Sequence, residues 1–480
     1  MPHRLTPLDA AFLDAEDEDR HTSMAIASVT VLEGPVPPQD EVIRAVDGKL
    51  PLVPRYRQKL RTVPFDLGRP VWVDDPDFDI RYHVRRTALP VPGDDAALCR
   101  LVGRLMSQRL DRDRPLWECW VIEGLAGGRW AMLLKVHHCM TDGIGGVNLQ
   151  RTMYDHTAQP GTAVVDGWQP AVSPSTWQLT LEALRDLVFS PAEQVRLISQ
   201  AVSNPTWAVR RVAATTKGLV ELMRAVAVPA TASSLSGPIS GYRRYAVGRA
   251  RFTDLHAVAR HFHVSINDVV LAAVSGAFRA LLIERNERPD AHVVRTLVPV
   301  SVRAPDEHGT HDNRISLMLP FLPVDVADPV DRLRTVHESM SRLKNSREAE
   351  AGEAMTTLAK HEPFPPISWG IRLASHLPQR SIITVTTNVP GPREPLYLLG
   401  RRILEILPYV PIAVRLRTGV SILTYCDAVA FGVTSDYRSA PEADRLARGV
   451  EAGVAELVAA CAVPKPQPRR RSPRARRTSA

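Results

Sequence analysis

The sequence predicts a mixed α/β protein built from two halves of similar size. Short apolar runs with the length of buried strands alternate with apolar periodicities typical of helices. Two polar, turn-rich stretches, residues 161–174 and 229–241, separate the halves from a largely helical segment. With 480 residues, 44% of them hydrophobic, the chain is long enough for two or three domains and a sizeable core. The expected regions are an N-terminal lobe (1–165), a helical connector (166–240), a C-terminal lobe (241–463) and a disordered basic tail (464–480).

In the first half, the strongest signal is a hairpin. Glu118–Glu123 and Trp130–Val136 flank a glycine-rich turn, so we expect them to pair as antiparallel strands. Met24–Leu32 alternates small and branched apolar residues, as core strands do. The other elements expected here are a short helix capped by Thr6 or Asp9 and running through Leu13, a helix at Asp40–Lys49, a strand with a turn at Trp72–Val84, and an amphipathic helix at Asp94–Leu110.

In the second half, Ser265 and Asp268 have the spacing of a capping box before an apolar helix at Val269–Ile283. Three late apolar runs are expected to complete an open sheet of this half: Ile403–Pro411, Gly419–Tyr425 and Ala428–Val433. The remaining expected elements are strands at Tyr242–Phe252, Val293–Val302, Asn313–Pro320 and Ser381–Val389, and helices at Leu333–Lys344 and Pro441–Ala462.

Two adjacent histidines stand where the strand Trp130–Val136 ends, in the stretch K-V-H-H-C-M-T-D-G-I-G-G. An imidazole at a strand end is held rigidly and can still face a cleft. Histidine is also the side chain whose unperturbed pKa suits proton transfer near neutral pH. His137 and His138 therefore predict a general-base site.

The residues that follow fit this site. Asp142 opens a helix expected at Ile144–Tyr154, where a carboxylate is favourable. Gly143, Gly145 and Gly146 lack side chains, so they leave the backbone open to a bulky ligand.

Two other uses of the same stretch are less favoured. Adjacent histidines can bind zinc, but neither H-E-x-x-H nor C-x-x-C is present to supply a third ligand, so no metal is expected. Cys139 beside His138 suggests a thiolate nucleophile. However, neighbouring side chains in an extended segment point to opposite faces.

Charge and cysteine content limit the partners and the compartment. Seven basic residues and no acid lie in the tail, so the rest of the chain is nearly neutral despite the formal net charge of +8. No aromatic residue is interleaved with the tail arginines, which argues against nucleic acid. The tail is either a solvated terminus or a weak anchor to anionic lipid headgroups, and basic and apolar residues of the connector would also suit a membrane surface.

Five scattered cysteines without paired spacing favour a reducing, cytosolic compartment. Acidic residues crowd the first twenty positions, which is unlike a secretory leader. No uncharged apolar run of about 18 residues is present, so no membrane span is expected. We therefore expect a cytoplasmic protein, soluble or peripheral on the inner face of the membrane or on lipid droplets.

The motif His137–Gly143, H-H-x-x-x-D-G, resembles the active-site motif of acyl-CoA-dependent acyltransferases, which include chloramphenicol acetyltransferase and peptide-synthetase condensation domains. Further segments narrow the resemblance. Pro7–Leu13, Pro115–Trp117, Asn267-Asp268 and Asn388–Pro392 occur in the order found in the bacterial wax ester synthase/diacylglycerol acyltransferase family. The resemblance runs from about Leu5 to about Val463.

This resemblance implies a fold of two chloramphenicol-acetyltransferase-like lobes, each a mixed sheet flanked by helices, around a central channel. It implies that His138 is the general base and that His137 orients the loop. Asp142 would pair with an arginine that the sequence does not identify, and Gly143 would let the chain turn closely behind the histidines. Gly145 and Gly146 would leave room for substrate.

Three further motifs have a structural as well as a functional reading. Asn267 would donate a hydrogen bond to substrate or intermediate and Asp268 would fix local structure, although both could simply complete the helix cap. Core packing explains Pro115–Trp117, and a rigid turn explains Asn388–Pro392.

The function implied is an O-acyltransferase that esterifies diacylglycerol or a long-chain alcohol with fatty acyl-CoA, which is a substrate, so no cofactor is expected. One alternative is a related acyltransferase for a polyketide, glycolipid or carrier-bound acceptor. Another is a non-catalytic lipid-droplet protein that retains the scaffold. Motifs do not distinguish the acceptors, because tertiary packing sets pocket dimensions.

Overall fold

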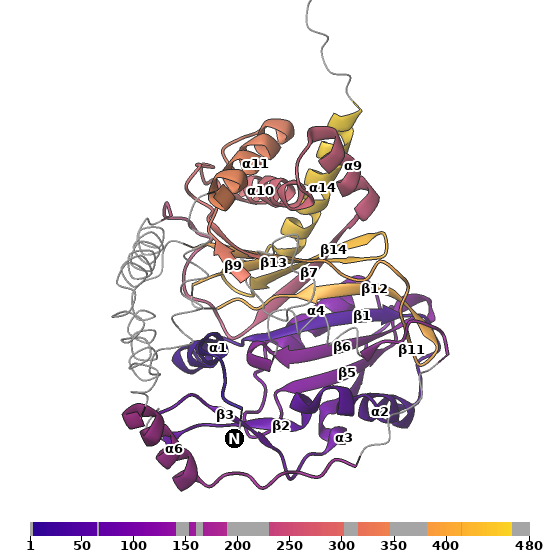
Figure 1. The fold of residues 1–480 in the computed structure, drawn as a ribbon. Helices are drawn as coiled ribbons and strands as arrows, with labels where there is room; N and C mark the ends of the chain where they lie inside the picture. Colours follow the sequence, from indigo (N-terminus) through magenta and orange to yellow (C-terminus); the bar gives the residue numbers. More distant parts are fainter. Residues whose placement is uncertain are drawn as a thin grey trace, which may run out of the picture.

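The computed structural model describes two six-stranded sheets that lie one above the other, with a two-stranded ribbon below them (Figure 1). The described residues are 3–64, 67–140, 153–159, 167–189, 230–301, 315–345, 382–413 and 415–462. Asp142, Gly143, Gly145 and Gly146, most of the predicted helix Ile144–Tyr154, most of the connector and the basic tail lie outside them.

The first sheet has the strand order β11-β12-β1-β6-β5-β4. Its strands are β1 (Ala25–Leu32), β4 (Val84–Ala88), β5 (Trp117–Glu123), β6 (Trp130–His137), β11 (Tyr397–Leu398) and β12 (Arg401–Tyr409). β5 and β6 pair antiparallel, with Trp117 opposite Val136, which confirms the predicted hairpin. β6 is hydrogen-bonded on both sides and buried along its whole length.

The second sheet has the order β7-β14-β13-β10-β8-β9. Its strands are β7 (Arg243–Arg251), β8 (Thr296–Ser301), β9 (Ile315–Met318), β10 (Thr384–Val389), β13 (Thr418–Tyr425) and β14 (Ala428–Asp436). One face is covered by α9 (Phe252–Phe262), α10 (Ile266–Glu284), α11 (Pro329–Asn345) and α14 (Ala443–Cys461) (Figure 1). The ribbon pairs β2 (Gln58–Arg61) with β3 (Val71–Asp74).

The helices of the first half are α1 (Pro7–Glu18), α2 (Gln39–Asp47), α3 (Ile80–His83) and α4 (Asp95–Met106), joined by 3₁₀ turns that include η2 (Pro54–Arg57) and η5 (His138–Met140). Helix α6 (Thr176–Phe189) belongs to the connector. Two predicted caps are confirmed. Thr6 accepts the N–H of Asp9, and Ser265 with Asp268 forms the capping box of α10.

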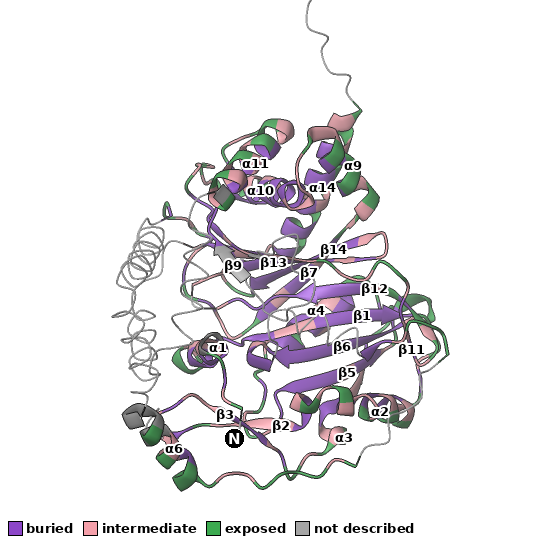
Figure 2. Ribbon diagram, in the orientation of Figure 1, coloured by how far each residue is buried: buried purple, intermediate pink, exposed green. Residues whose placement is uncertain are grey.

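Each sheet carries its own apolar core (Figure 2). The core of the second lobe centres on α10, which is long and apolar enough to cross a membrane by length and composition alone. Residues such as Val270, Val274 and Phe278 are fully buried, so α10 serves as a core helix. A helix that is buried on all sides needs apolar residues around its whole circumference.

One strand prediction was wrong. The run Ile403–Pro411 was expected in the second sheet, but β12 pairs antiparallel with β1 in the first. The chain thus returns from the second lobe to complete the first sheet before it enters β13. A strand's apolar pattern indicates burial but not its partner, because the pairing is set by contacts far away in sequence.

The return strand brings the two sheets into contact. The carbonyl of Pro408 in β12 accepts hydrogen bonds from the Tyr245 hydroxyl at 2.8 Å and from Ser421 Oγ at 3.0 Å. Both donors belong to the second sheet. Position 432 must be glycine here, since a Cβ on Gly432 would lie 1.8 Å from the Pro408 oxygen.

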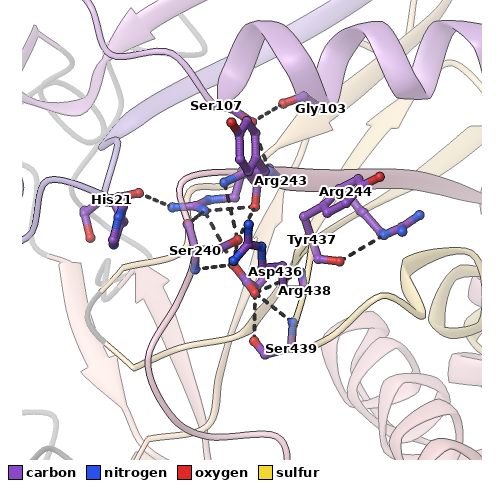
Figure 3. A network of polar contacts seen from close by, with 12 residues as sticks. His21, Gly103, Ser107, Ser240, Arg243, Arg244, Asp436, Tyr437, Arg438 and Ser439 are labelled. Carbon is purple, nitrogen blue, oxygen red and sulfur yellow. Dashed lines mark hydrogen bonds and ion pairs between the residues drawn. The ribbon is translucent and has the colours of Figure 1, made fainter.

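A second junction lies at the start of β7, where Arg243 is buried (Figure 3). Its backbone N–H donates to Ser107 Oγ at 2.9 Å, and its guanidinium donates to the carbonyl of His21 and lies 3.8 Å from the Asp436 carboxylate. Burial raises the pKa of Asp436, but hydrogen bonds from Ser439 and Ser240 outweigh it, so the pKa is lowered. The network joins β7 and β14 to α4 and to the segment after α1.

We expect Gly432→Ala to destabilise the protein by about 1–3 kcal/mol, because the added methyl must displace the Pro408 carbonyl from a packed junction. Urea unfolding followed by circular dichroism measures this change. Gly167→Ala is the matched control, since a Cβ at Gly167 meets no atom within 4 Å. Equal stability of the two variants would show that the junction yields without strain.

Candidate active site

Strand β6 delivers the two histidines to the end of the first sheet, as the sequence predicted. His137 is the last residue of β6 and lies opposite Ala25 of β1. Its N–H donates to the Leu116 carbonyl at 2.9 Å, and the N–H of His138 donates to the Met24 carbonyl at 3.0 Å. The backbone of both residues is therefore fixed by neighbouring strands before the chain turns into η5.

The ring of His137 is buried, with 1% of its surface exposed. Its Nδ1 accepts the backbone N–H of Cys139 at 3.2 Å. Its Nε2 lies 3.4 Å from Oε1 of Glu16 in α1. His137 therefore joins the strand end to α1.

The Glu16 carboxylate collects several donors inside the protein. The N–H of Met24 donates to Oε1 at 2.6 Å, and Arg112 donates to Oε2 at 3.1 Å. Burial by itself raises the pKa of Glu16, but its interaction with the nearby His137 ring, together with the Met24 and Arg112 donors, lowers it to about 2. Glu16 is thus a buried carboxylate at neutral pH, stabilised by its partners.

Two arginines that follow α4 hold the carboxyl end of α1. Arg112 donates to the Leu13 carbonyl at 3.1 Å and pairs with Asp17 at 2.9 Å. Arg109 donates to the carbonyl of Thr22 at 2.8 Å and also to the carbonyl of Glu16. Cations at a helix C-terminus satisfy its last carbonyls and its dipole.

His138 stands against the same helix. Its ring centroid lies 4.0 Å from that of Phe12, one turn before Glu16 on α1. Residues four apart share a helix face, so α1 contacts both histidines at once. Burial, with a smaller effect from His137, lowers the pKa of His138 to about 4. The imidazole is consequently neutral at physiological pH, as a general base must be.

A cavity of about 370 Å³ is lined in part by Cys139 and Met140 of η5, which directly follow His138, but by neither histidine. The other lining residues are His3, Arg4, Leu5, Thr6, Asp9, Pro54, Arg55, Gln58 and Trp72. Burial raises the pKa of the Cys139 thiol well above its ordinary value, which argues against a thiolate nucleophile.

Lys135, two residues before His137 on β6, is buried and binds the end of α4. Its Nζ donates to the carbonyls of Leu105 and Gln108 at 3.0 and 2.6 Å and lies 3.9 Å from Glu118. Burial lowers the pKa of Lys135 to about 8. The side chain thereby fixes the carboxyl end of α4, from which Arg109 and Arg112 follow.

In the second lobe, the structure brings Asn267 together with Asn388. Asn388 Nδ2 lies 3.5 Å from Asn267 Oδ1, where β10 ends and α10 begins. Asp268 is buried and serves the helix cap, and its Oδ2 also lies 2.9 Å from His337 Nδ1. Oδ1 of Asp268 is buried with no hydrogen-bond partner among the described residues.

The two remaining motifs have structural surroundings. Trp117 is buried, donates from Nε1 to the Tyr56 carbonyl at 2.8 Å and stacks on His83 at 4.5 Å. The turn after β10 is pinned where the Gly391 N–H donates to Thr424 Oγ1 at 2.9 Å. These contacts fit the core-packing and turn interpretations.

Sequence reasoning missed Glu16 and Phe12. Glu16 belongs to the acidic run that argued against a leader, and nothing local distinguishes it from its exposed neighbours Asp17 and Glu18. The one usable signal was the i, i+4 spacing of Phe12 and Glu16 on a predicted helix. In the part of the chain that the structure describes, no three His, Cys, Asp or Glu side chains are grouped to hold a metal ion.

Replacing Glu16 tests the support that α1 gives. The folded-state pKa is below the ordinary 4.5, so the carboxylate adds stability above pH 4.5, and this is lost as the pH falls toward 2. Glu16→Gln should lower the unfolding free energy at pH 7 by about 3 kcal/mol and weaken the loss of stability below pH 4.5.

Urea titrations between pH 3 and 7 measure both effects. Asp17→Asn is the matched control, because Asp17 pairs with the same arginine but is 59% exposed and should matter by less than about 1 kcal/mol. If both substitutions lower the free energy of unfolding equally, the stabilisation comes from Arg112 alone.

Comparison with known proteins identifies the family. The wax ester synthase/diacylglycerol acyltransferase catalytic domain matches residues 5–270, and the C-terminal domain of the same family matches residues 311–458. A probable diacylglycerol O-acyltransferase of Mycobacterium tuberculosis, tgs1, is 45% identical over 457 residues, which cover 95% of this chain and 96% of that protein.

Solved structures agree on the fold. The wax ester synthase/diacylglycerol acyltransferase of Marinobacter aquaeolei VT8 aligns with a TM-score of 0.64 at 25% identity, over 96% of this chain and all of that one. A variant of the starter condensation domain of rhizomide synthetase RzmA, in complex with C8-CoA, aligns with a TM-score of 0.56 at 15% identity, over 96% and 95% of the two chains. The likeness to the condensation domain shows the two-lobed fold alone. The chain described here belongs to the wax ester synthase/diacylglycerol acyltransferase family of acyltransferases.

Proposed function

We propose that this enzyme transfers the acyl group of a fatty acyl-CoA to the hydroxyl of a diacylglycerol or of a long-chain alcohol, with His138 as the general base. The observation that carries the proposal is the imidazole of His138, which has a lowered pKa and is held at the end of β6 against Phe12 of α1. The 45% identical mycobacterial relative supports diacylglycerol as an acceptor.

The reaction needs one base and no acyl-enzyme. His138 accepts the proton of the acceptor hydroxyl while its oxygen attacks the thioester carbonyl, which forms the new C–O bond. Collapse of the tetrahedral intermediate breaks the C–S bond, and the CoA thiolate takes the proton from His138 as it leaves. No further cofactor takes part, because acyl-CoA is itself the activated substrate.

The other residues have supporting roles. His137, tied to Glu16, orients the loop that carries His138. Asp142 and Gly143 shape that loop, and Gly145 and Gly146 leave space for acyl-CoA. Asn267 donates a hydrogen bond to the substrate or to the developing oxyanion, a position where one donor contributes about 3–4 kcal/mol. Asp268 keeps the cap of α10 in place. The substrates would meet in a channel between the lobes.

The acceptors dissolve in lipid, so we propose that the enzyme works in the cytoplasm while attached peripherally to the inner face of the membrane or to lipid droplets. The basic tail, residues 464–480, is one candidate attachment, since cations are attracted to anionic headgroups.

The direct test is turnover. Purified enzyme is incubated with palmitoyl-CoA and either a diacylglycerol or a long-chain alcohol, and both free CoA thiol and ester are measured. His138→Ala should lower the rate by about 10²–10⁴-fold, the usual contribution of a general base. The exposed histidine of α9 supplies the control, His256→Ala, which should retain the wild-type rate. Absence of ester with either acceptor would exclude the neutral-lipid function, and full activity of the His138 variant would exclude its role.

The pH dependence provides a second test. Because the folded-state pKa of His138 is about 4, the base remains unprotonated down to that pH. We expect kcat/KM to fall only as the pH approaches 4, whereas an unperturbed histidine would give a limb near 6.5. Samples are returned to pH 7.5 after each incubation and assayed again. Activity that returns was lost by reversible protonation, whereas activity that does not return was lost by unfolding. An acid limb near 6.5 would contradict the environment described for His138.

A further inference from the structure

The ring of Phe12 is in contact with the ring of His138. Helix α1, which carries Phe12, packs on η5, the turn that begins with His138 at the end of β6 (Figure 1). The two ring centroids lie 4.0 Å apart, with 33° between the ring planes. At this separation the rings are in van der Waals contact, so no water fits between them. One face of the imidazole is therefore covered by Phe12.

The imidazole needs such a contact to be held in one orientation. The backbone of His138 is fixed, because its N–H donates to the Met24 carbonyl at 3.0 Å. The ring can still turn about the bond that joins it to Cβ, since this torsion has only a broad preference. The ring nitrogens lie in the ring plane, so the direction from which they accept a proton turns with the ring. Packing against one face of the ring fixes this direction.

Phe12 is itself held in place by the residue that holds His138. Glu16 follows Phe12 by one turn of α1, and its carboxylate accepts the N–H of Met24 at 2.6 Å. The carbonyl of the same Met24 accepts the N–H of His138. These contacts close a ring, which runs from Phe12 along α1 to Glu16, across Met24 to the base, and back between the two aromatic rings. Helix α1 is therefore kept at a fixed distance from the base.

The apolar core does not account for Phe12. Leu13, the next residue of α1, is 5% exposed and belongs to the core of the first lobe. Phe12 is half-buried, and it belongs neither to that core nor to the partly buried apolar side chains that pack against it. A large aromatic side chain usually contributes by burial in a core. Here its ring packs on the side chain that serves as the base.

We propose that Phe12 is a positioning residue of the acyl transfer, which fixes the plane of the His138 ring and keeps water from one of its faces. This role rests on the function proposed above, because Phe12 acts through the general base. Loss of the contact should lower kcat rather than raise KM, since a misaligned base slows proton transfer without removing a substrate contact.

Steady-state kinetics of Phe12→Ala test this role. We expect kcat to fall by about tenfold, while the KM for palmitoyl-CoA and for the acceptor changes by less than about twofold. Phe12→Tyr keeps the ring, so its kcat should stay within about twofold of wild type. A kcat that is unchanged or raised in Phe12→Ala would overturn the proposal, as would an equal loss of kcat in the two variants.

The pKa of His138 gives a measurement that does not depend on turnover. Burial, with a smaller effect from His137, lowers this pKa to about 4. Phe12→Ala admits water to the covered face, so the pKa should rise by about one unit or more toward the ordinary 6.5. A stronger base alone would raise kcat, so a fall in kcat together with a raised pKa identifies lost orientation.

NMR titration of the histidine ring signals measures this pKa, and the signal of His138 is assigned by its absence in His138→Ala. In the wild type this signal should not titrate above about pH 5, whereas in Phe12→Ala its midpoint should lie above that pH. An unchanged midpoint would overturn the proposal. The described titratable and charged side chains around the base are the same in both proteins: Asp9, Glu16, Arg112, His137 and Cys139.

Two controls separate this role from a general loss of structure. Leu13→Ala removes a core side chain from the same helix, so it should lower the melting temperature more than Phe12→Ala and change kcat by less than about twofold. Phe252→Ala removes a ring that lies 6.1 Å from that of His256 on α9, and it should change neither kcat nor the titration of His138. Equal losses of melting temperature in Phe12→Ala and Leu13→Ala, with kcat and titration unchanged, would make Phe12 a structural residue only.

Failure of the proposed function has a different signature. If the wild type forms no ester with any acceptor, the acyltransferase function fails and the kinetic role of Phe12 fails with it. The NMR titration then decides the remaining part of the proposal, because a raised midpoint in Phe12→Ala still shows that Phe12 keeps water from the His138 ring.

Discussion

The structure around the histidines depends on one buried carboxylate, that of Glu16. It accepts hydrogen bonds from the backbone N–H of Met24, just before β1, and from Arg112 after α4, and it lies 3.4 Å from the ring of His137 at the end of β6. A carboxylate placed in the interior without such donors would be neutral, because burial disfavours charge. With them its pKa is about 2, so a permanent negative charge fixes three segments of the first lobe relative to one another.

These contacts form a series of supports that ends at His138. Lys135 fixes the carboxyl end of α4, and the arginines that follow α4 hold the end of α1. Helix α1 then places Phe12 against the ring of His138. Buried ion pairs add little net stability compared with apolar packing, but they specify geometry, because removing one partner leaves the other uncompensated. Their position here, next to the rings of His137 and His138, fits that role.

Local patterns predicted most of the elements because local forces determine them. The hairpin β5–β6, the cap of α10 and the position of the histidines at a strand end all follow from periodicity and spacing within about twenty residues. The place of β12 could not be predicted, since an apolar strand fits either sheet and its partner β1 lies far away in sequence. Glu16 could not be identified for the same reason, because nothing in the local sequence shows that one carboxylate of an acidic run is buried.

The return of β12 also bears on how the site is assembled. The histidines belong to the first lobe, whereas Asn267 and Asn388 belong to the second. A flexible hinge between lobes would let these groups drift, but β12 is hydrogen-bonded to β1 and its Pro408 carbonyl is held by donors of the second sheet. Separating the lobes would require breaking strand pairing or leaving that carbonyl unsatisfied, and both are costly in a buried interior. The spacing between His138 and the amide groups of Asn267 and Asn388 is therefore set by the fold.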